Sequence, residues 1–345
     1  MNKPSLEVAE FYITNVCNFN CTGCNRFNNY AFTGHQRWAD YADVYAQWAE
    51  KLDLSRWTIL GGEPFSNPDI LSWVEGVSNL WPNKHGSLVT NGSYLVNDKG
   101  SLYDILKRKP NIVLDIGLHN ENRKKPMIET VKNWLQGEIK SIRSPERVSD
   151  LPGFQESWPD SWARLKLPHW PDCPTIEDMW NLPEEIQQEC IEIHNISPEI
   201  IAEQRLEWVF VDANGVTVKI HDEDYFHHGA LVTTKTGITV HTSNREQAHK
   251  ICHSSDCHHF MNGLLYKCGQ VSLFPEFDRQ FGLELDQRQR DLMNQYQPCS
   301  VNGDIKSFVS AIKNSIPQCE FCPENYKFEK IWSSTKKIKI KKLSN

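Results

Sequence analysis

The sequence predicts an α/β fold, because short apolar runs alternate with helical stretches along its first third. Strand-like runs cover residues 8–14, 57–60, 87–92 and 112–119, and a helical stretch at about residues 41–52 separates the first two. Strands that alternate with helices in this way are typical of parallel sheets. A chain of 345 residues can bury one large core of this class and carry a smaller appended domain.

Three cysteines directly follow the first strand-like run and form the most specific motif in the chain. Cys17, Cys21 and Cys24 lie in Val-Cys-Asn-Phe-Asn-Cys-Thr-Gly-Cys, with the spacing Cys-x3-Cys-x2-Cys. A loop this short can wrap three thiolates around one [4Fe–4S] cluster and leave the fourth iron without a protein ligand, whereas electron-transfer clusters normally take four cysteines. The open iron can then bind a substrate or a cofactor. The alternatives to a cluster are a zinc knuckle or three thiols without a common role.

A glycine-rich segment ends the second strand-like run. Gly61-Gly62-Glu63-Pro64 follows the apolar residues 57–60. An ordinary turn explains two glycines and a proline after a strand. The functional interpretation is that two residues without side chains allow the backbone to approach a ligand closely, while Glu63 offers a carboxylate.

In this order the two motifs resemble those of the radical S-adenosylmethionine (SAM) superfamily. The resemblance covers about residues 7–125 well and extends loosely to residue 245. It implies a partial (β/α)6 barrel, similar to a TIM barrel, in which the open iron chelates SAM and an electron from the cluster cleaves SAM to a 5′-deoxyadenosyl radical. It also implies that the glycine-rich motif contacts the SAM amino group. The SAM-binding residues implied there are Gly61, Gly62, Glu63 and Pro64.

Two further strand ends carry polar side chains that the resemblance makes candidates for binding SAM or the substrate. Asn91 lies in the Thr-Asn-Gly that ends the run at residues 87–92, and His119 ends the run at residues 112–119. The alternative for Asn91 is a plain turn, and the alternative for His119 is a strand-end histidine bonded to backbone.

One position departs from the family pattern. Gly23 stands directly before the third cysteine, where relatives usually carry an aromatic residue that packs near the adenine. The departure concerns adenine packing and leaves the proposed cluster ligands unaffected. Phe19 and Phe27 are the candidates to compensate for it.

The last third of the chain contains a second cysteine pattern. Cys252 precedes Gly263-Leu-Leu-Tyr-Lys-Cys268, a segment typical of a short hairpin, and a Cys-x2-Cys pair follows much later. Four thiolates from separated segments suit a complete [4Fe–4S] cluster or a tetrahedral zinc ion. The pattern is similar to the twitch domain, the shortened relative of the SPASM domain that follows some radical SAM barrels. The auxiliary-cluster ligands implied by this resemblance are Cys252, Cys268, Cys319 and Cys322.

The remaining cysteines are predicted to have other roles. Cys257 is the main rival for a place among the four ligands, whereas Cys173, Cys190 and Cys299 are expected to be buried small apolar residues. Eleven cysteines in a large chain without a signal peptide point to metal ligands in a reducing compartment. No apolar stretch approaches the ~20 residues of a membrane span. We therefore expect a cytoplasmic protein with no membrane partner.

Composition divides the chain into four parts. Residues 1–245 are predicted to form the barrel, interrupted by a proline- and tryptophan-rich insertion at about residues 140–205, and residues 246–330 to form the auxiliary iron–sulfur domain. The insertion either packs against the barrel flank or forms a wall over its open end. Residues 331–345 form a basic tail, which is either a solvated terminus or a phosphate contact. Beyond the insertion, Asn214-Gly215 predicts a hairpin between strands at 208–211 and 216–220.

The predicted function is that of a radical SAM oxidoreductase or maturase. The resemblance implies hydrogen abstraction from a peptide side chain or a small polar metabolite, an auxiliary [4Fe–4S] cluster that assists oxidation, and a reductant such as flavodoxin or ferredoxin. A radical SAM enzyme that modifies nucleic acid is the first alternative, and the net charge of −7 disfavours it. A non-catalytic iron–sulfur or zinc binding protein is the second. The sequence assigns no general acid or base.

Overall fold

The structure is a computed structural model that describes residues 3–119, 121–143, 207–222, 225–227, 229–252, 257–325, 328–330 and 333–334. Most of the predicted insertion and of the basic tail lies outside the described residues, as do Cys173 and Cys190. Those predictions therefore stay predictions.

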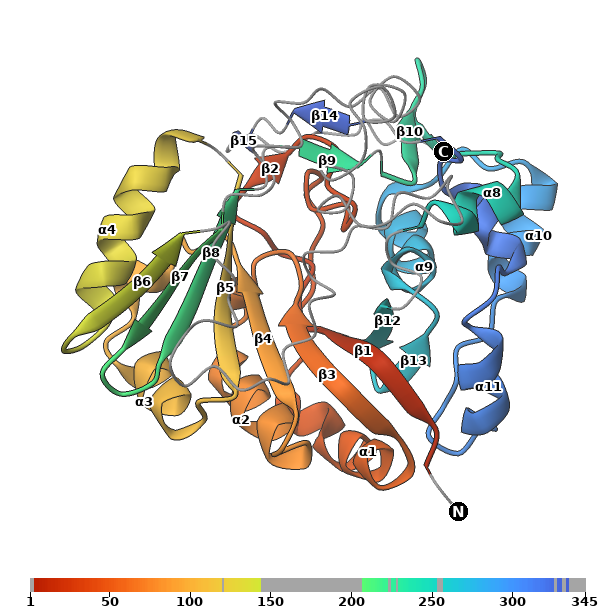
Figure 1. The fold of residues 1–345 in the computed structure, drawn as a ribbon. Coiled ribbons are helices and arrows are strands. Elements are labelled where there is room, and N and C mark those ends of the chain that lie inside the picture. Colours follow the sequence, from red (N-terminus) through yellow and green to blue (C-terminus); the bar gives the residue numbers. More distant parts are fainter. Residues whose placement is uncertain are drawn as a thin grey trace, which may run out of the picture.

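A nine-stranded sheet organises the chain, in the order β13-β12-β1-β3-β4-β5-β8-β7-β6 (Figure 1). Its six central strands run parallel to one another. These are β12 (Cys257–Met261), β1 (Ser5–Tyr12), β3 (Asp53–Leu60), β4 (His85–Thr90), β5 (Ile112–Leu118) and β8 (Thr217–Asp222). The edges are antiparallel strands, namely β13 (Leu264–Tyr266), β7 (Glu207–Asp212) and β6 (Ile139–Arg143). The predicted α/β class is confirmed as a mixed α/β fold with a mainly parallel sheet.

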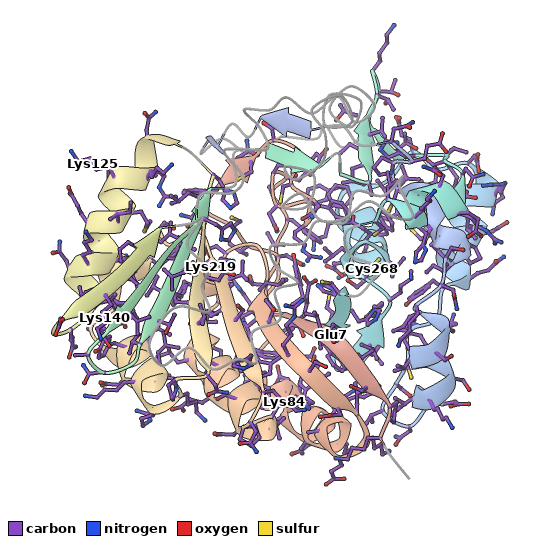
Figure 2. The ribbon with its side chains drawn as sticks, viewed as in Figure 1. Glu7, Lys84, Lys125, Lys140, Lys219 and Cys268 are labelled. Atoms are coloured by element: carbon purple, nitrogen blue, oxygen red, sulfur yellow. The ribbon has the colours of Figure 1, made fainter. Side chains whose placement is uncertain are left out.

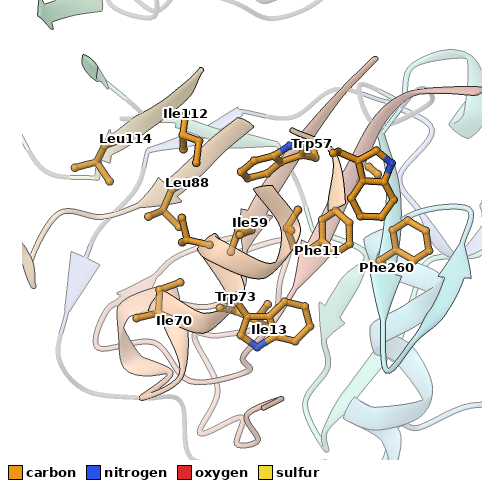
Figure 3. Packing of buried hydrophobic residues seen from close by; sticks show 14 of the residues in the cluster. Phe11, Ile13, Trp57, Ile59, Ile70, Trp73, Leu88, Ile112, Leu114 and Phe260 are labelled. Carbon is orange, nitrogen blue, oxygen red and sulfur yellow. The ribbon is translucent and has the colours of Figure 1, made fainter. Parts of the chain in front are cut away.

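Helices connect the first strands and cover one face of the sheet (Figure 1). They are α1 (Trp38–Lys51), α2 (Ile70–Leu80), α3 (Ser101–Arg108) and α4 (Lys124–Trp134). Alternate strand residues such as Phe11, Ile59 and Leu88 join Trp73 of α2 in one buried apolar cluster (Figure 3). Because successive strand residues point to opposite faces, the residues between them face the other side of the sheet.

That other face is polar over its central strands. The register aligns one row of residues across six strands, and buried polar groups are frequent in it. The row is His259, Glu10, Thr58, Ser87, Val113 and Thr217. Buried polar side chains are costly unless they are paired, so a face that gathers them indicates a site rather than a core.

The C-terminal third contains α8 (Arg245–Lys250), α9 (Gly269–Phe281), α10 (Gln287–Gln295), α11 (Ile305–Ala311) and the 3-10 helix η6 (Pro317–Phe321). Its strand β12 pairs with β1, so the main sheet continues across the boundary predicted at residue 245. Phe27 beside the cysteine loop stacks on Phe274 of α9, with ring centroids 5.7 Å apart. The C-terminal helices are therefore packed directly against the cysteine loop, although the domain boundary itself stays a prediction.

The predicted hairpin after the insertion is confirmed. β7 and β8 pair antiparallel, and Gly215 in their turn has a φ of 80°, which glycine adopts without strain. β11 (Ile238–Val240) pairs with β10 (Leu231–Thr233) outside the main sheet. Two further short pairs are β9 (Tyr225–His227) with β14 (Phe328–Lys330) and β2 (Asn20–Cys21) with β15 (Ser333–Ser334). Among the residues that the structure describes, no helix has both the length and the apolar character needed to cross a membrane.

Candidate functional site

The loop that carries Cys17, Cys21 and Cys24 begins just beyond β1, at the carboxyl edge of the parallel strands. Its backbone is tightly folded, with the N–H of Phe27 donating to the carbonyl of Cys24 at 3.0 Å. The N–H of Phe19 points at Cys17 Sγ, 3.4 Å away. Backbone N–H groups that surround sulfur favour its thiolate form.

The backbone conformation of the cysteine loop explains why position 23 is a glycine. Its φ of 71° lies in the left-handed region, where a residue with a Cβ is disfavoured. The neighbouring Phe27 adopts the same region, with a φ of 62°, and is fixed there by packing against α9. Phe27 is therefore a core residue of the loop, which leaves Phe19 as the aromatic side chain nearer to the solvent-accessible part of the loop.

The two glycines of the Gly-Gly-Glu-Pro motif dock against the start of the cysteine loop. The N–H of Gly62 donates to the carbonyl of Thr14, and the N–H of Glu63 donates to the carbonyl of Val16, both at 2.8 Å. A Cβ on Gly61 would lie 2.7 Å from the Thr14 carbonyl oxygen, and a Cβ on Gly62 would overlap the backbone of Val16. Both glycines are thus required for the close approach of two backbone segments.

Glu63 is fully buried and its carboxylate is held by three donors. Oε1 accepts from Thr90 Oγ1 at 2.7 Å and from the N–H of Phe65 at 3.1 Å, and Oε2 accepts from the N–H of Asn91 at 2.7 Å. Burial raises the pKa of Glu63 to about 6, although these hydrogen bonds and the charge of Arg123 oppose the shift. The carboxylate that was predicted to meet an ammonium group therefore also ties the end of β3 to the end of β4.

Asn91 links the end of β4 to the cysteine loop. Its Nδ2 donates to Asn18 Oδ1 at 2.9 Å and lies 4.0 Å from Cys17 Sγ. Its Oδ1 accepts from the N–H of Ser93 at 3.0 Å. The structure thus brings the predicted residues Cys17, Glu63 and Asn91 into one contiguous network.

Arg123 is a site residue that the sequence interpretation missed. It follows β5 at the end of the 3-10 helix η3 (Glu121–Arg123), and its guanidinium lies over the Phe19 ring, 4.5 Å from the centroid. Burial lowers the pKa of Arg123, while the charges of Glu63 and Cys21 raise it. Its buried Nη1 has no hydrogen-bond partner among the described residues. The only signal in the sequence is a basic residue a few positions beyond a strand end.

His119 lies at the end of β5, half-buried, on the same edge of the sheet as Arg123. Deeper on the polar face, the register places Asp115 of β5 opposite Lys219 of β8. Asp115 Oδ1 lies 2.9 Å from Nδ1 of His221. Burial would raise the pKa of Asp115, but the charges of Lys219 and His221 outweigh it and lower that pKa. Asp115 is therefore a buried carboxylate. Lys219, which lies opposite Asp115 on the neighbouring strand β8, is labelled in Figure 2.

The four cysteines predicted to hold an auxiliary centre lie on three segments of the C-terminal third. Cys268 is the N-cap of α9 (Figure 2), Cys252 follows α8, and Cys319 and Cys322 lie at η6. Burial raises the pKa of Cys322 well above its usual value, and the charges of the other three raise it further. The three other thiols are therefore near enough to Cys322 to influence its ionisation.

Cys257, the main rival for a place among the four auxiliary ligands, lies on a different element. Cys257 belongs to β12, opposite Val8 of β1, and its charge acts on Arg26 and Arg56 rather than on Cys322. Cys299 is 6% exposed, as expected for a buried small residue. Among the described residues, no group of three or more His, Cys, Asp or Glu side chains is placed to hold a single metal ion.

A family model described as "Radical SAM superfamily" matches residues 11–140. Residues 11–140 are therefore similar to the radical SAM superfamily. The matched segment begins in β1 and ends in β6, so it contains the cysteine loop, the glycine-rich motif and Arg123. It spans less than half of the chain, and no curated protein matches.

Solved structures give weaker likenesses. Crystal structures of SuiB from Streptococcus suis, alone and bound to S-adenosylmethionine, are each 20% identical over 38% of this chain, with a TM-score of 0.31. A third, of SuiB bound to the precursor peptide SuiA, is 19% identical over 39% of this chain, with the same TM-score. This chain spans only 30% to 31% of the length of SuiB.

The donors of the matched segment suit the group that the radical SAM superfamily implies. Three thiols stand on one loop, a backbone N–H and the amide of Asn91 surround Cys17, and the fold encloses that loop from three strand ends. Soft sulfur ligands of this kind suit an iron–sulfur cluster. The C-terminal set consists of sulfur ligands alone, and the chemistry of sulfur suits both a [4Fe–4S] cluster and a zinc ion.

Proposed function

We propose that the protein is a radical SAM enzyme which abstracts a hydrogen atom from a peptide side chain or a small polar metabolite. One observation carries the proposal: within a radical SAM domain, Glu63 and Asn91 join the cysteine loop to the ends of β3 and β4. When bound, the cluster and SAM would together supply a reductively generated 5′-deoxyadenosyl radical. Everything else in the reaction is positioning and the exclusion of water, which the protein must provide.

The roles of the binding residues follow from their surroundings. Cys17, Cys21 and Cys24 would hold the cluster. Arg123 would hold the carboxylate of SAM, because it is a half-buried cation whose buried Nη1 lacks a hydrogen-bond partner among the described residues. Glu63 would carry the negative charge for the SAM ammonium group and keep Asn91 in place.

The C-terminal cysteines would form an auxiliary centre in a twitch-like domain over residues 246–330. Their ligand set would be Cys252, Cys268, Cys319 and Cys322. A [4Fe–4S] cluster there would give the reaction a one-electron acceptor, which makes an oxidoreductase or maturase the preferred subclass. A flavodoxin or ferredoxin would be the external reductant.

The substrate would lie on the polar face of the sheet. Asp115, Lys219 and His221 stand on adjacent strands of that face, below the edge that carries Arg123. Buried charges in a site of low polarity interact strongly with polar ligands. This supports a substrate with polar or charged groups rather than a lipid.

The test is SAM cleavage without substrate. Protein purified and reconstituted without oxygen is reduced with dithionite, incubated with SAM, and assayed for 5′-deoxyadenosine and methionine by mass spectrometry. We expect both products in equal amounts, and the same products from Cys299→Ala, which removes a buried thiol outside both ligand sets. A fully iron-loaded protein that forms neither product would contradict the proposal and support a non-catalytic iron–sulfur protein.

A further inference from the structure

The aromatic ring of Phe19 contacts the guanidinium of Arg123. The Cζ atom of Arg123 lies over the ring, 4.5 Å from its centroid, and both residues are half-buried. A cation within ~6 Å of a ring centroid is attracted by the negative face of the aromatic system. Phe19 belongs to the cysteine loop and Arg123 follows β5, so the contact joins the loop to a distant strand end.

The backbone that carries Phe19 is held on both sides. In the preceding residue, Asn18 Nδ2 donates to Ser93 Oγ at 2.7 Å, and Asn18 Oδ1 accepts from Asn91 Nδ2 at 2.9 Å. The N–H of Phe19 itself points at Cys17 Sγ, 3.4 Å away. The residue after Phe19 begins β2, which pairs with β15. The position of the ring is therefore determined by the loop and does not depend on Arg123.

The surroundings of Arg123 oppose a cation at this position. Arg123 is the N-cap of α4, and the first turn of that helix contains no acidic residue. The N-terminus of a helix carries partial positive charge. Burial lowers the pKa of Arg123, while the charges of Glu63 and Cys21 raise it, and the oxygens of Glu63 already accept from three other donors. The ring thus adds attraction at a place where burial and the helix disfavour the charge.

An aromatic ring can hold a guanidinium without using its hydrogen-bond donors. A guanidinium has five N–H donors, and a protein carboxylate paired with it would occupy some of them. Stacking on a ring leaves these donors available for a ligand carboxylate, which can accept two parallel bonds. This agrees with Nη1 of Arg123, which is buried and has no hydrogen-bond partner among the described residues.

We propose that Phe19 is a positioning residue that holds Arg123 ready for the carboxylate of SAM. The inference rests on the proposed function, which assigns that carboxylate to Arg123. Without the ring, the long arginine side chain would lose more rotamer freedom when SAM binds, and affinity would fall. Phe19 was a candidate to compensate for Gly23 near the adenine. In this proposal it serves the amino-acid end of SAM instead.

The experiment measures the dissociation constant of SAM by equilibrium dialysis. The protein is loaded with iron, kept without oxygen and given no reductant, so that SAM is not cleaved. Phe19→Leu keeps an apolar side chain but removes the ring, and should raise the dissociation constant about 5-fold. Phe19→Tyr keeps the ring and should bind like wild type. Lys132→Gln is the matched control, because it breaks another cation–π contact, in which Nζ lies 5.9 Å from the centroid of the Phe210 ring.

Two comparisons show whether the ring acts through Arg123 on the carboxylate. In an Arg123→Gln background, which lacks the cation, Phe19→Leu should weaken SAM binding no further. Decarboxylated SAM keeps the adenosine, the sulfonium and the ammonium group, and it should bind equally to wild type and Phe19→Leu. A merely disturbed loop would instead weaken both ligands and add to the effect of Arg123→Gln. If decarboxylated SAM binds too weakly to measure, the double variant decides.

Iron content and wild-type affinity, measured first, separate the possible failures. Iron-loaded wild type that binds no SAM would contradict the proposed function, and unchanged affinity in Arg123→Gln would contradict the role given to Arg123 there. If both tests succeed, unchanged affinity in Phe19→Leu would overturn the inference alone. Equal losses for SAM and decarboxylated SAM, or a further loss in the double variant, would also overturn it. If Phe19→Leu fails to load iron, Phe19→Met replaces it.

Discussion

The carboxylate of Glu63 accepts a hydrogen bond from the backbone N–H of Asn91, with Oε2 2.7 Å from the nitrogen. The bond joins two motifs that are 28 residues apart, at the ends of β3 and β4. Asn91 in turn approaches Cys17, so the position of the cysteine loop depends on a buried carboxylate. Glu63 therefore has a structural role in addition to the charge that it would present to SAM.

Glu63→Gln should weaken SAM binding and leave the iron content near normal. Glutamine keeps the size of the side chain, but its amide has no negative charge and gives Asn91 a poorer acceptor. A hydrogen bond to a charged group contributes roughly 1.5–3 kcal/mol, so the dissociation constant should rise about 10- to 100-fold. Isothermal titration with the reconstituted protein measures it. Glu75→Gln on the exposed surface of α2 is the control, and equal affinities in both variants would remove Glu63 from the site.

The raised pKa of Glu63 predicts how stability depends on pH. Its pKa of about 6 in the folded protein exceeds the value near 4.3 that an unfolded chain shows. The folded state thus binds this proton first, and the free energy of unfolding should rise by about 2 kcal/mol as the pH falls from 7.5 to 4. Urea unfolding of the iron-free protein at several pH values measures it. The difference between wild type and Glu63→Gln isolates this group, and a difference that does not vary with pH would contradict the assignment.

Gly62→Ala should disrupt the first iron site. The added Cβ overlaps the backbone of Val16, which can move only with the cysteine loop. We expect reduced stability and a loss of about half the iron. Gly229→Ala is a suitable control, because its Cβ would meet the carbonyl oxygens of Gly23 and Cys24 at ordinary distances of 3.6 and 3.8 Å. Normal iron loading of Gly62→Ala would show that the close approach is not needed.

Local patterns predicted the architecture of the first third well. The strand-like runs at 57–60, 87–92 and 112–119 correspond to β3, β4 and β5, because each alternates with a helix and ends in a turn. The pairing of β12 with β1 was not predicted. These strands are about 250 residues apart in the chain, and no local pattern encodes such a long-range contact.

The motifs of the candidate site were predicted from the sequence. Its isolated charged residues were identified only in the structure. Cysteine spacing and a Gly-Gly-Glu-Pro segment are visible because their members are close in sequence. Arg26, Arg123 and Asp115 belong to no spacing pattern, and only the folded backbone brings them to Glu10, Phe19 and His221. The glycines were interpreted as making room for a ligand, and the structure adds that they allow another part of the backbone to approach closely.

The identity of the second centre can be tested separately from the first. Cys268→Ala or Cys319→Ala should remove about half the iron, because three thiolates hold a coordinatively complete cluster poorly. SAM cleavage should survive in both variants, since the open-iron site is separate. Metal analysis checks this prediction. About one zinc per chain, with iron unchanged by either substitution, would instead indicate a structural cap without an electron acceptor.

The central claim is that Cys17, Cys21 and Cys24 hold the cluster that cleaves SAM, and one measurement tests it most directly. The triple variant with alanine at all three positions is prepared without oxygen beside wild type, and each is assayed for iron and for 5′-deoxyadenosine after reduction with dithionite. We predict about eight irons and product formation in wild type, and about half the iron with no product in the variant. Undiminished SAM cleavage by the triple variant would contradict this account.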